Sequence, residues 1–255
     1  MTKPSIFITG AGSGIGKATA ELFAAQGWRI ALCDIDCSRI ESLAAELGDA
    51  VTAYQANVCD PDSLASALEA FAGADGFDVL FNCAGILEMR EFAECSLAAM
   101  HKLIDVNVNG VINGMHLALP YLRQRPRSRI ITMSSVAAVH GIPEEAAYSA
   151  SKFAVRALTE ALNIELEAAG IWVCDVMVAY VATPMVLSPQ IKARSVDILG
   201  VNVMPQQVAE TVWQALKERK VHWFVTPEDE AIAQQIDSTL WEERRGLMKQ
   251  ITGFA

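Results

Sequence analysis

The sequence lacks the features that mark several protein classes. Its 255 residues include six cysteines but no C-x-x-C pair, and the four histidines are scattered, so neither a disulfide framework nor a zinc site is expected. No apolar run approaches the ~20 residues of a membrane-spanning helix, and we find no secretory signal. The net charge of −10 leaves no basic surface for nucleic acid or anionic membranes. We expect a cytoplasmic protein with reduced thiols that binds no metal, nucleic acid or membrane.

Apolar residues are abundant enough for a large buried core. They make up 52% of the chain and charged residues only 20%, which excludes a disordered protein. Short β-branched runs, apolar on both faces, alternate with longer alanine- and leucine-rich runs, as in a parallel sheet covered by helices on each side. Strands are predicted over 5–9, 29–34, 51–55, 78–83, 129–133, 172–177 and 221–225, and helices over 14–25, 38–47, 62–71, 97–122, 147–168 and 206–219.

This alternation predicts an α/β fold, with one doubly wound domain that spans the whole chain and a seven-stranded parallel sheet flanked by helices. Ser38 and Asp62 are expected to cap helix N-termini, and Gly27 and Gly170 to lie just past helix ends. The tail, 227–255, is expected to be an appended C-terminal helix. No repeat, low-complexity segment or linker divides the sequence.

A glycine-rich turn follows the first predicted strand. Residues 9–16 read T-G-A-G-S-G-I-G and lead into the first predicted helix. Glycines there let the backbone approach a pyrophosphate, and the free N–H groups and dipole of the helix start attract the anion. A purely structural turn is the alternative, but the strand before and the helix after favour a dinucleotide site.

Asp34 ends the second predicted strand, near the offset at which an acid binds the adenosine ribose. A carboxylate there accepts hydrogen bonds from both ribose hydroxyls and repels a 2′-phosphate. The turn offers no compensating base at Ala11 or Ser13, and Ile35 follows the acid. The sequence therefore favours NAD over NADP, with a solvated strand-end acid as the alternative.

A serine pair and a tyrosine–lysine pair form the central constellation. Ser134 and Ser135 end the fifth strand, and Tyr148 and Lys152 open the helix that follows. Four residues apart, the phenol and the ammonium share one helix face. The lysine cation, together with the positive nicotinamide ring, is expected to stabilise the phenolate and lower its pKa from about 10. Tyr148 is therefore predicted to be a general acid/base.

With these motifs in order, the chain resembles the short-chain dehydrogenase/reductase family along nearly its whole length. The resemblance extends to N-C-A-G at 82–85 and to Asn107 in the next helix. It implies a Rossmann-type fold in which Ser135 orients the substrate oxygen, Tyr148 exchanges its proton, and Lys152 also holds the nicotinamide ribose. It further implies cofactor contacts from Gly10, Ser13, Gly14, Ile15, Gly16, Asp34, Asn57, Val58, Asn82, Ala84, Gly85, Tyr148, Lys152, Val181 and Thr183.

Two of the implied residues, and the serine beside Ser135, have further readings. Asn107 would anchor a water through which the proton reaches solvent, but it would also serve to cap or kink its helix. Asn82 would equally brace the sheet, and Ser134 is expected to be a bystander. In the family, helices corresponding to 97–122 and 147–168 build dimers or tetramers, so a homodimer or homotetramer is expected. Small residues on the second helix would permit close approach: Ala150, Ala154 and Ala157.

Two positions depart from the family pattern. Asn57 stands where an aspartate usually contacts the adenine edge, and an amide still donates and accepts there. Val178 and Ala179 stand where Pro-Gly is common, and losing the glycine forbids backbone angles that the loop otherwise has available. The chain also lacks the D-G-G ending common in ketoacyl-carrier-protein reductases, which argues against a role in fatty-acid synthesis.

In the family, the segment corresponding to 185–204 closes over the substrate. Here it is rich in apolar side chains, which favours a medium-sized, largely uncharged hydroxyl or keto compound. One alternative is that part of this segment is core packing. Another is that Lys192 or Arg194 pairs with a carboxylate or phosphate on the substrate.

Taken together, the sequence predicts an NAD(H)-dependent oxidoreductase that interconverts a secondary alcohol and a ketone. Substrate identity and working direction are left open at this point. An NADP-dependent carbonyl reductase differs only around Asp34. A non-catalytic dinucleotide-binding sensor is disfavoured because such proteins typically lose the tyrosine or the lysine, and both are present here.

Overall fold

The computed structural model describes residues 3–254, and a parallel seven-stranded sheet lies at its centre. The strand order is β3-β2-β1-β4-β5-β6-β7, with every neighbouring pair parallel. The seven predicted strands are confirmed, with the fourth and seventh each one residue shorter at both ends. The strands are β1 (Ser5–Thr9), β2 (Arg29–Asp34), β3 (Val51–Gln55), β4 (Val79–Asn82), β5 (Arg129–Met133), β6 (Trp172–Met177) and β7 (His222–Phe224).

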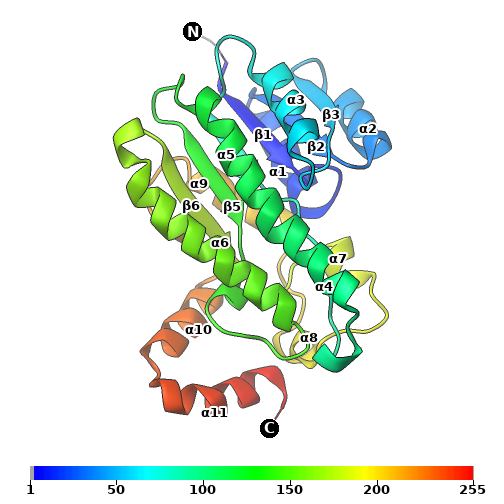
Figure 1. Ribbon diagram of the computed structural model, residues 1–255, viewed down its shortest axis with the longest axis vertical. Helices are drawn as coiled ribbons and strands as arrows, with labels where there is room; N and C mark the ends of the chain where they lie inside the picture. The colour runs from blue at the N-terminus through cyan, green and yellow to red at the C-terminus, as the bar shows by residue number, and fades with distance from the viewer. Residues whose placement is uncertain (1–2, 255) are drawn as a thin grey trace.

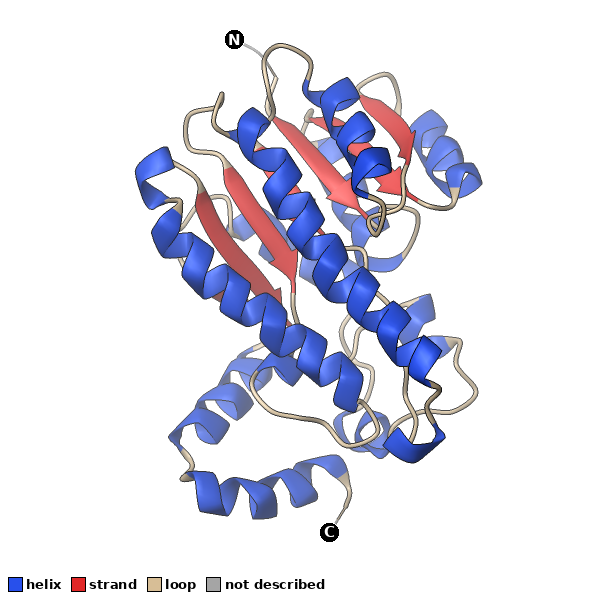
Figure 2. Ribbon diagram, in the orientation of Figure 1, coloured by secondary structure: helices blue, strands red, loops and turns tan. Residues whose placement is uncertain are grey.

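Helices cover both faces of this sheet (Figures 1 and 2). Each face has its own apolar core, one built around Phe23 and Val212 and the other around Phe7 and Leu68. Both sides of each central strand are therefore buried, which explains their nearly continuous apolar sequences. The first core is covered by α1 (Gly14–Ala25), α2 (Cys37–Leu47) and α9 (Pro205–Gln214), and the second by α3 (Pro61–Ala72), α5 (Gly110–Leu122) and α6 (Ala146–Glu165).

The helix ends follow local capping chemistry. Gly27 and Gly170 have φ angles of +77° and +75° just past helix ends, as predicted. The predicted N-caps are wrong, because Asp36 and Asp60, each two residues earlier, accept the hydrogen bonds of the first-turn N–H groups. The structure therefore begins α2 and α3 one residue earlier than predicted, and a proline occupies the first position of α3.

Two predicted helices are interrupted. The one over 97–122 is α4 (Leu97–Ile104), a π-helical turn (Asp105–Asn109) and α5. The C-terminal tail forms two helices, α10 (Pro227–Ser238) and α11 (Trp241–Thr252), instead of the single helix predicted. Figure 1 shows this pair at the opposite end of the molecule from the N-terminus, where α11 packs against α8 (Arg194–Leu199).

The strand order reverses direction between β1 and β4, from which the chain builds outward to both sides. In an open parallel sheet, connections on either side of such a point leave a crevice at the carboxyl ends of the strands. The glycine-rich turn after β1, the segment after β4 and the serines after β5 all meet at this edge. The fold therefore brings the predicted motifs to one place.

Candidate active site

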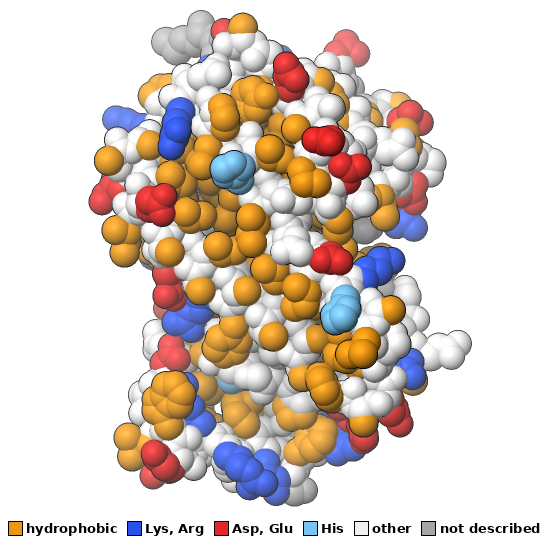
Figure 3. Space-filling view, in the orientation of Figure 1, with side chains coloured by type: hydrophobic (Ala, Val, Ile, Leu, Met, Phe, Trp, Pro, Cys, Tyr) orange, Lys and Arg blue, Asp and Glu red, His pale blue; other side chains and the backbone are white. Residues whose placement is uncertain are grey.

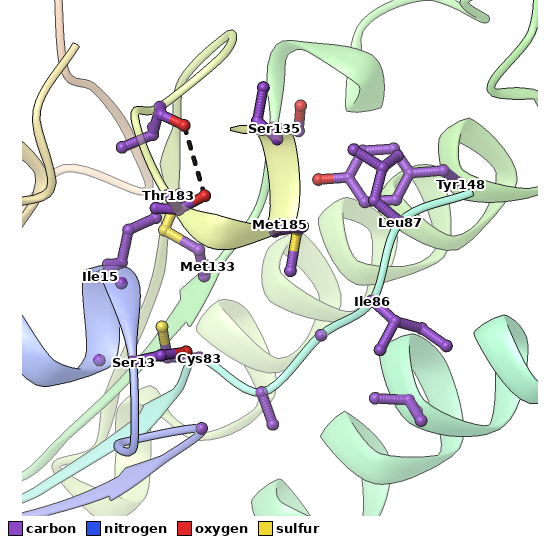
Figure 4. A pocket seen from close by; sticks show the side chains of 18 of the residues that line it. Ser13, Ile15, Cys83, Ile86, Leu87, Met133, Ser135, Tyr148, Thr183 and Met185 are labelled. Atoms are coloured by element: carbon purple, nitrogen blue, oxygen red, sulfur yellow. Dashed lines mark hydrogen bonds between the residues drawn. The ribbon is translucent and has the colours of Figure 1, made fainter. Parts of the chain in front are cut away.

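A cavity of about 660 Å³ opens at the carboxyl edge of the sheet. It runs from the glycine-rich turn to the segment after β6, and Figure 4 shows Ser13 and Ile15 on one side with Ser135 and Tyr148 on the other. All but two of the predicted site residues line it. Those that do are Gly10, Ser13, Gly14, Ile15, Gly16, Asp34, Asn57, Val58, Ala84, Gly85, Ser135, Tyr148, Lys152, Val181 and Thr183.

The glycine-rich turn packs too tightly for side chains at two of its positions. A Cβ on Gly10, whose φ is +67°, would lie 2.7 Å from the Ala84 Cα, and one on Gly16 would lie 2.2 Å from the Gly10 carbonyl oxygen. Helix α1 then starts without a side-chain cap and without an acid in its first turn. Its first N–H groups therefore have no protein side chain as a partner, which suits an anion.

Asp34 lies in the cavity wall at the end of β2. Its two carboxylate oxygens accept hydrogen bonds from the backbone N–H groups of Gly12, at 2.9 Å, and Asp36, at 3.0 Å. The expectation that no basic residue lies near this acid is wrong. Arg39, from the first turn of α2, also lines the cavity, with its guanidinium 3.0 Å from the Asp36 carboxylate.

Ser135, Tyr148 and Lys152 converge at the other end of the cavity. The Lys152 Nζ donates a hydrogen bond to the Met133 carbonyl at 2.8 Å and lies 5.4 Å from the centre of the Tyr148 ring. The Ser135 hydroxyl donates to the Val178 carbonyl at 3.2 Å. The phenol, a hydroxyl and an ammonium thus line one cavity. Spacing predicted the shared helix face of Tyr148 and Lys152, and the family resemblance implied that Ser135 would join them.

Burial changes the ionisation of these groups. Removal from water lowers the pKa of Lys152 to about 8. Burial also raises the pKa of Tyr148, and the nearby Glu145 adds to this, while hydrogen bonding to Ser135 acts in the opposite direction. The protein's own groups therefore move the phenol pKa upward, against the direction predicted from Lys152.

Two predicted site residues lie behind the cavity wall. Asn107, in the π-helical turn, is bound on both sides of its amide: Oδ1 accepts from the Ile86 N–H, and Nδ2 donates to the Ile86 carbonyl and to Ser151 Oγ. Asn82 is buried beneath α5, where its Oδ1 would lie 2.4 Å from a Cβ on Gly114. Neither lines the cavity. The π turn positions Asn107, and such turns are frequent at functional sites.

The loop after β6 has ordinary backbone geometry despite its unusual sequence. Among residues 3–254, only Arg127 and Glu144 are non-glycine residues with a positive φ. Val178 and Ala179 therefore adopt common angles without the family's glycine. The Val178 carbonyl accepts hydrogen bonds from both the Val136 N–H and the Ser135 hydroxyl. This fixes the loop to the end of β5.

The segment over 185–204 has mixed roles. Met185, in α7 (Pro184–Leu187), and Leu199 line the cavity, and Val196 is buried in a small apolar cluster. Val186 belongs to both the cavity wall and that cluster. Part of the segment therefore belongs to the cavity wall and part to core packing, and its closure over a substrate stays a prediction. Neither basic residue of the segment lines the cavity. The Arg194 guanidinium lies 3.3 Å from Glu144 and stacks over the Phe254 ring.

Within residues 3–254, no three histidine, cysteine or acidic side chains gather in a way that would hold a metal ion. In the same part of the chain no helix combines the length and the apolar character needed to cross a membrane.

Comparison with known proteins decides the family. The model of the family described as short chain dehydrogenase matches residues 4–193. The chain belongs to the short-chain dehydrogenase/reductase family. This confirms the resemblance inferred from the motifs and identifies an oxidoreductase of this type.

Relatives and solved structures agree with this membership. The chain is 34% identical over 214 residues to cyclohexanol dehydrogenase of Acinetobacter sp. (strain SE19), covering 80% of this chain and 84% of that one. It superposes with a TM-score of 0.82 and 26% identity on a family member from Burkholderia phymatum in complex with NAD, covering 91% and 92% of the two chains. A short-chain dehydrogenase from Sphingobium yanoikuyae in complex with NADPH gives 0.80 at 28% identity, with 96% and 95% covered.

The cavity wall contains polar residues that were not predicted, namely Arg39, Lys102, Asp105, Glu145 and Tyr180. Glu145 and Tyr180 both line the cavity, and the Tyr180 hydroxyl donates to Glu145 Oε1 at 2.7 Å. Glu145 precedes the tyrosine motif, and Tyr180 lies in the segment whose sequence departs from the family. That departure was a signal for Tyr180. No local pattern distinguishes Glu145 from its neighbour Glu144.

Proposed function

We propose that this protein is an NAD(H)-dependent oxidoreductase that interconverts a neutral secondary alcohol and the corresponding ketone. The observation that carries the proposal is the convergence, in one cavity, of Ser135, Tyr148 and Lys152 with the glycine-rich turn and Asp34. Proton exchange needs the first three, and a dinucleotide needs the turn and the acid.

The residues present fit a nicotinamide dinucleotide. The uncapped start of α1 offers N–H groups for the pyrophosphate, and the missing Cβ atoms of Gly10 and Gly16 let the turn form. Asp34 would accept hydrogen bonds from the adenosine ribose, and Lys152 would hold the nicotinamide ribose. When bound, the dinucleotide supplies hydride transfer, while the protein contributes placement and charge.

The choice of NAD over NADP rests on Asp34. Its carboxylate would repel a 2′-phosphate, and the Arg39 guanidinium is engaged by Asp36. Arg39 is nevertheless a specific observation in favour of the second candidate, an NADP-dependent carbonyl reductase, because a free guanidinium there would bind a phosphate. Related structures hold NAD, NADH and NADPH, so relatives alone do not distinguish the two.

The proton chemistry follows from the buried groups. Ser135 would bind the substrate oxygen while Tyr148 removes or returns its proton. Lys152, whose ammonium lies over the phenol ring at 5.4 Å from its centre, would stabilise the phenolate. Asn107 would connect this pair to solvent through water, which stays a prediction.

The substrate is proposed to be largely apolar and uncharged. Ile86, Leu87, Ile142, Met185 and Leu199 line the cavity near the proposed reacting groups, and neither Lys192 nor Arg194 does. An apolar wall favours an apolar ligand body, with orientation left to a few polar groups. The relative named cyclohexanol dehydrogenase supports a small alicyclic alcohol as a first probe.

We further propose a homo-oligomer that uses the outer face of α5 and α6. Figure 3 shows apolar side chains along this face, and Ile112 and Phe153 are 41% and 44% exposed on it. Ala150 and Ala157 are exposed beside them, which leaves room for a second helix to approach.

A substrate screen tests the proposed function. Purified protein with NAD is offered a panel of secondary alcohols, starting with cyclohexanol, and the formation of NADH is followed by absorbance. We expect turnover of neutral alcohols with NAD. Stronger turnover of matched carboxylated alcohols, or of NADP over NAD, would overturn the proposal.

A further inference from the structure

Glu145 is the N-cap residue of α6, but its side chain does not cap the helix. A side chain at this position usually accepts a hydrogen bond from the first helical turn, and Glu145 makes no such bond. It is instead 2% exposed and lines the cavity. Its Oε1 accepts a hydrogen bond from the Tyr180 hydroxyl, which in turn lies 2.7 Å from Ser195 Oγ. The segment after β6 therefore holds the carboxyl in the cavity wall through the Tyr180 hydroxyl.

The second carboxyl oxygen has no partner. Within residues 3–254 Glu145 forms no ion pair, and no hydrogen bond reaches Oε2. Oε2 is not among the buried polar atoms without a partner, so it keeps some accessible surface, and the residue to which it belongs lines the cavity. Burial raises the pKa of Glu145 to about 7. A buried acid with one free oxygen facing a cavity is costly to keep unless a ligand uses it.

The surroundings restrict what that ligand group is. At this end of the cavity the hydroxyl groups of Tyr180, Tyr148 and Ser135 lie among apolar side chains, and the ammonium of Lys152 belongs to the proposed reaction centre. A substrate carboxylate would be repelled by ionised Glu145, and an ammonium would be repelled by Lys152 and by an oxidised nicotinamide. A hydroxyl suits both forms of the acid, since it donates to a carboxylate and accepts from a protonated carboxyl.

Glu145 lies close to Tyr148, the proposed general acid/base. It stands three residues before Tyr148, immediately ahead of α6, and both side chains line the same cavity. After burial itself, the charge of Glu145 is the main cause that raises the pKa of Tyr148, which fits a short separation. A group bound by Glu145 therefore lies close to the oxygen that Tyr148 would serve.

We infer that Glu145 is a specificity-determining residue that binds a second hydroxyl of the substrate, on the carbon next to the reacting one or on the carbon after it. The preferred substrates are then neutral diols, or the hydroxyketones formed from them, rather than simple alcohols. The inference rests on the proposed function and names the substrate class of that same cavity.

The test compares cyclohexanol and 2-methylcyclohexanol with cyclohexane-1,2-diol and cyclohexane-1,3-diol. For the wild type we expect kcat/KM for at least one diol to exceed that of both mono-alcohols by about tenfold, because a site with a free polar group discriminates against ligands that leave it unpaired. In Glu145→Leu this ratio should fall to about one or below. Glu145→Gln, whose amide oxygen can still accept from Tyr180 and whose N–H groups can donate to the substrate, should retain part of it.

A matched control is the neighbouring acid. Glu144 pairs with Arg194 and does not line the cavity, so Glu144→Gln should leave the diol-to-alcohol ratio within about twofold. A wild-type ratio of one or less, or the same ratio in wild type and Glu145→Leu, would overturn the inference while leaving the proposed function intact.

Failure of the proposed function gives a different result, namely no turnover of any alcohol with NAD. In that case the affinity of the protein for a diol, compared with that for cyclohexanol, tests the inference. Isothermal titration of the NADH-loaded protein should show tighter binding of a diol than of cyclohexanol, by about tenfold, and the difference should be lost in Glu145→Leu. Equal affinities in the wild type would contradict it. Thermal unfolding of each variant checks that it is folded.

Discussion

Replacing Asp34 by alanine tests how the protein selects its dinucleotide. Each carboxylate oxygen already accepts one backbone N–H, from Gly12 or Asp36, and keeps a lone pair for a ribose hydroxyl. A hydrogen bond to a charged group contributes ~1.5–3 kcal/mol. Loss of one such bond should lower kcat/KM for NAD about 10- to 150-fold, since each 1.36 kcal/mol is about tenfold.

The same substitution removes a repulsion from NADP. Two unit charges 4 Å apart near a protein surface interact by ~4 kcal/mol before solvent and ions screen them. A gain of about tenfold in kcat/KM for NADP is therefore expected, with Arg39 then the nearest charged partner for the phosphate. The ratio of NAD to NADP efficiency should fall at least ~100-fold in Asp34→Ala, when the two changes are multiplied.

Initial rates with each cofactor at saturating alcohol give this ratio. Asp49→Ala, an exposed acid outside the cavity, is the control and should leave the ratio within about twofold. Thermal unfolding should show a loss of only ~1 kcal/mol, because the released N–H groups of Gly12 and Asp36 find water. Wild-type protein that uses NADP as well as NAD, or equal losses for both cofactors in Asp34→Ala, would refute the reasoning.

Three further predictions concern the turn, the sheet edge and the assembly. Gly16→Ala should abolish detectable NADH binding and lower stability by ~1–3 kcal/mol, measured by titration and denaturant unfolding, because its Cβ would meet backbone at 2.2 Å. Burial lowers the pKa of His222, but the Asp175 carboxylate 2.9 Å away outweighs this and raises it, so the stabilisation is present below about pH 6.5 and lost as pH rises through the raised value. His222→Gln should therefore lower the melting temperature most at pH 6 and progressively less toward pH 9; a constant difference would contradict this. Phe153→Glu should convert an oligomer to monomers in light scattering, and an unchanged mass would exclude the α6 face.

The strands and the first turn were predictable because their signals are local. A strand buried on both faces is apolar without interruption, and the turn needs glycine at positions where a Cβ has no space, as at Gly10 and Gly16. The spacing of Tyr148 and Lys152 likewise fixes their shared face through helix geometry alone. These features need no knowledge of what packs against them.

The errors arose where two local signals compete or where distant segments meet. Ser38 and Asp36 are both good caps, and only the path of the chain decides between them. Arg39 follows Asp34 by five positions, and only the path of the chain into α2 brings its side chain to the cavity. The contact of Tyr180 with Glu145 joins residues 35 apart in sequence, so no periodicity reports it.

The central claim is that Tyr148 exchanges the proton of the substrate, and removing its one oxygen atom tests this most directly. Tyr148→Phe removes the phenolic hydroxyl, keeps the ring beside Lys152 and leaves the dinucleotide end of the cavity unchanged. Oxidation of a neutral secondary alcohol with NAD is measured alongside NADH affinity by fluorescence titration. The account predicts that kcat falls by at least ~100-fold, the lower end for a lost general acid/base, while the Kd for NADH stays within about threefold. Retention of more than about a hundredth of the wild-type kcat, with the protein folded and NADH bound, would contradict it.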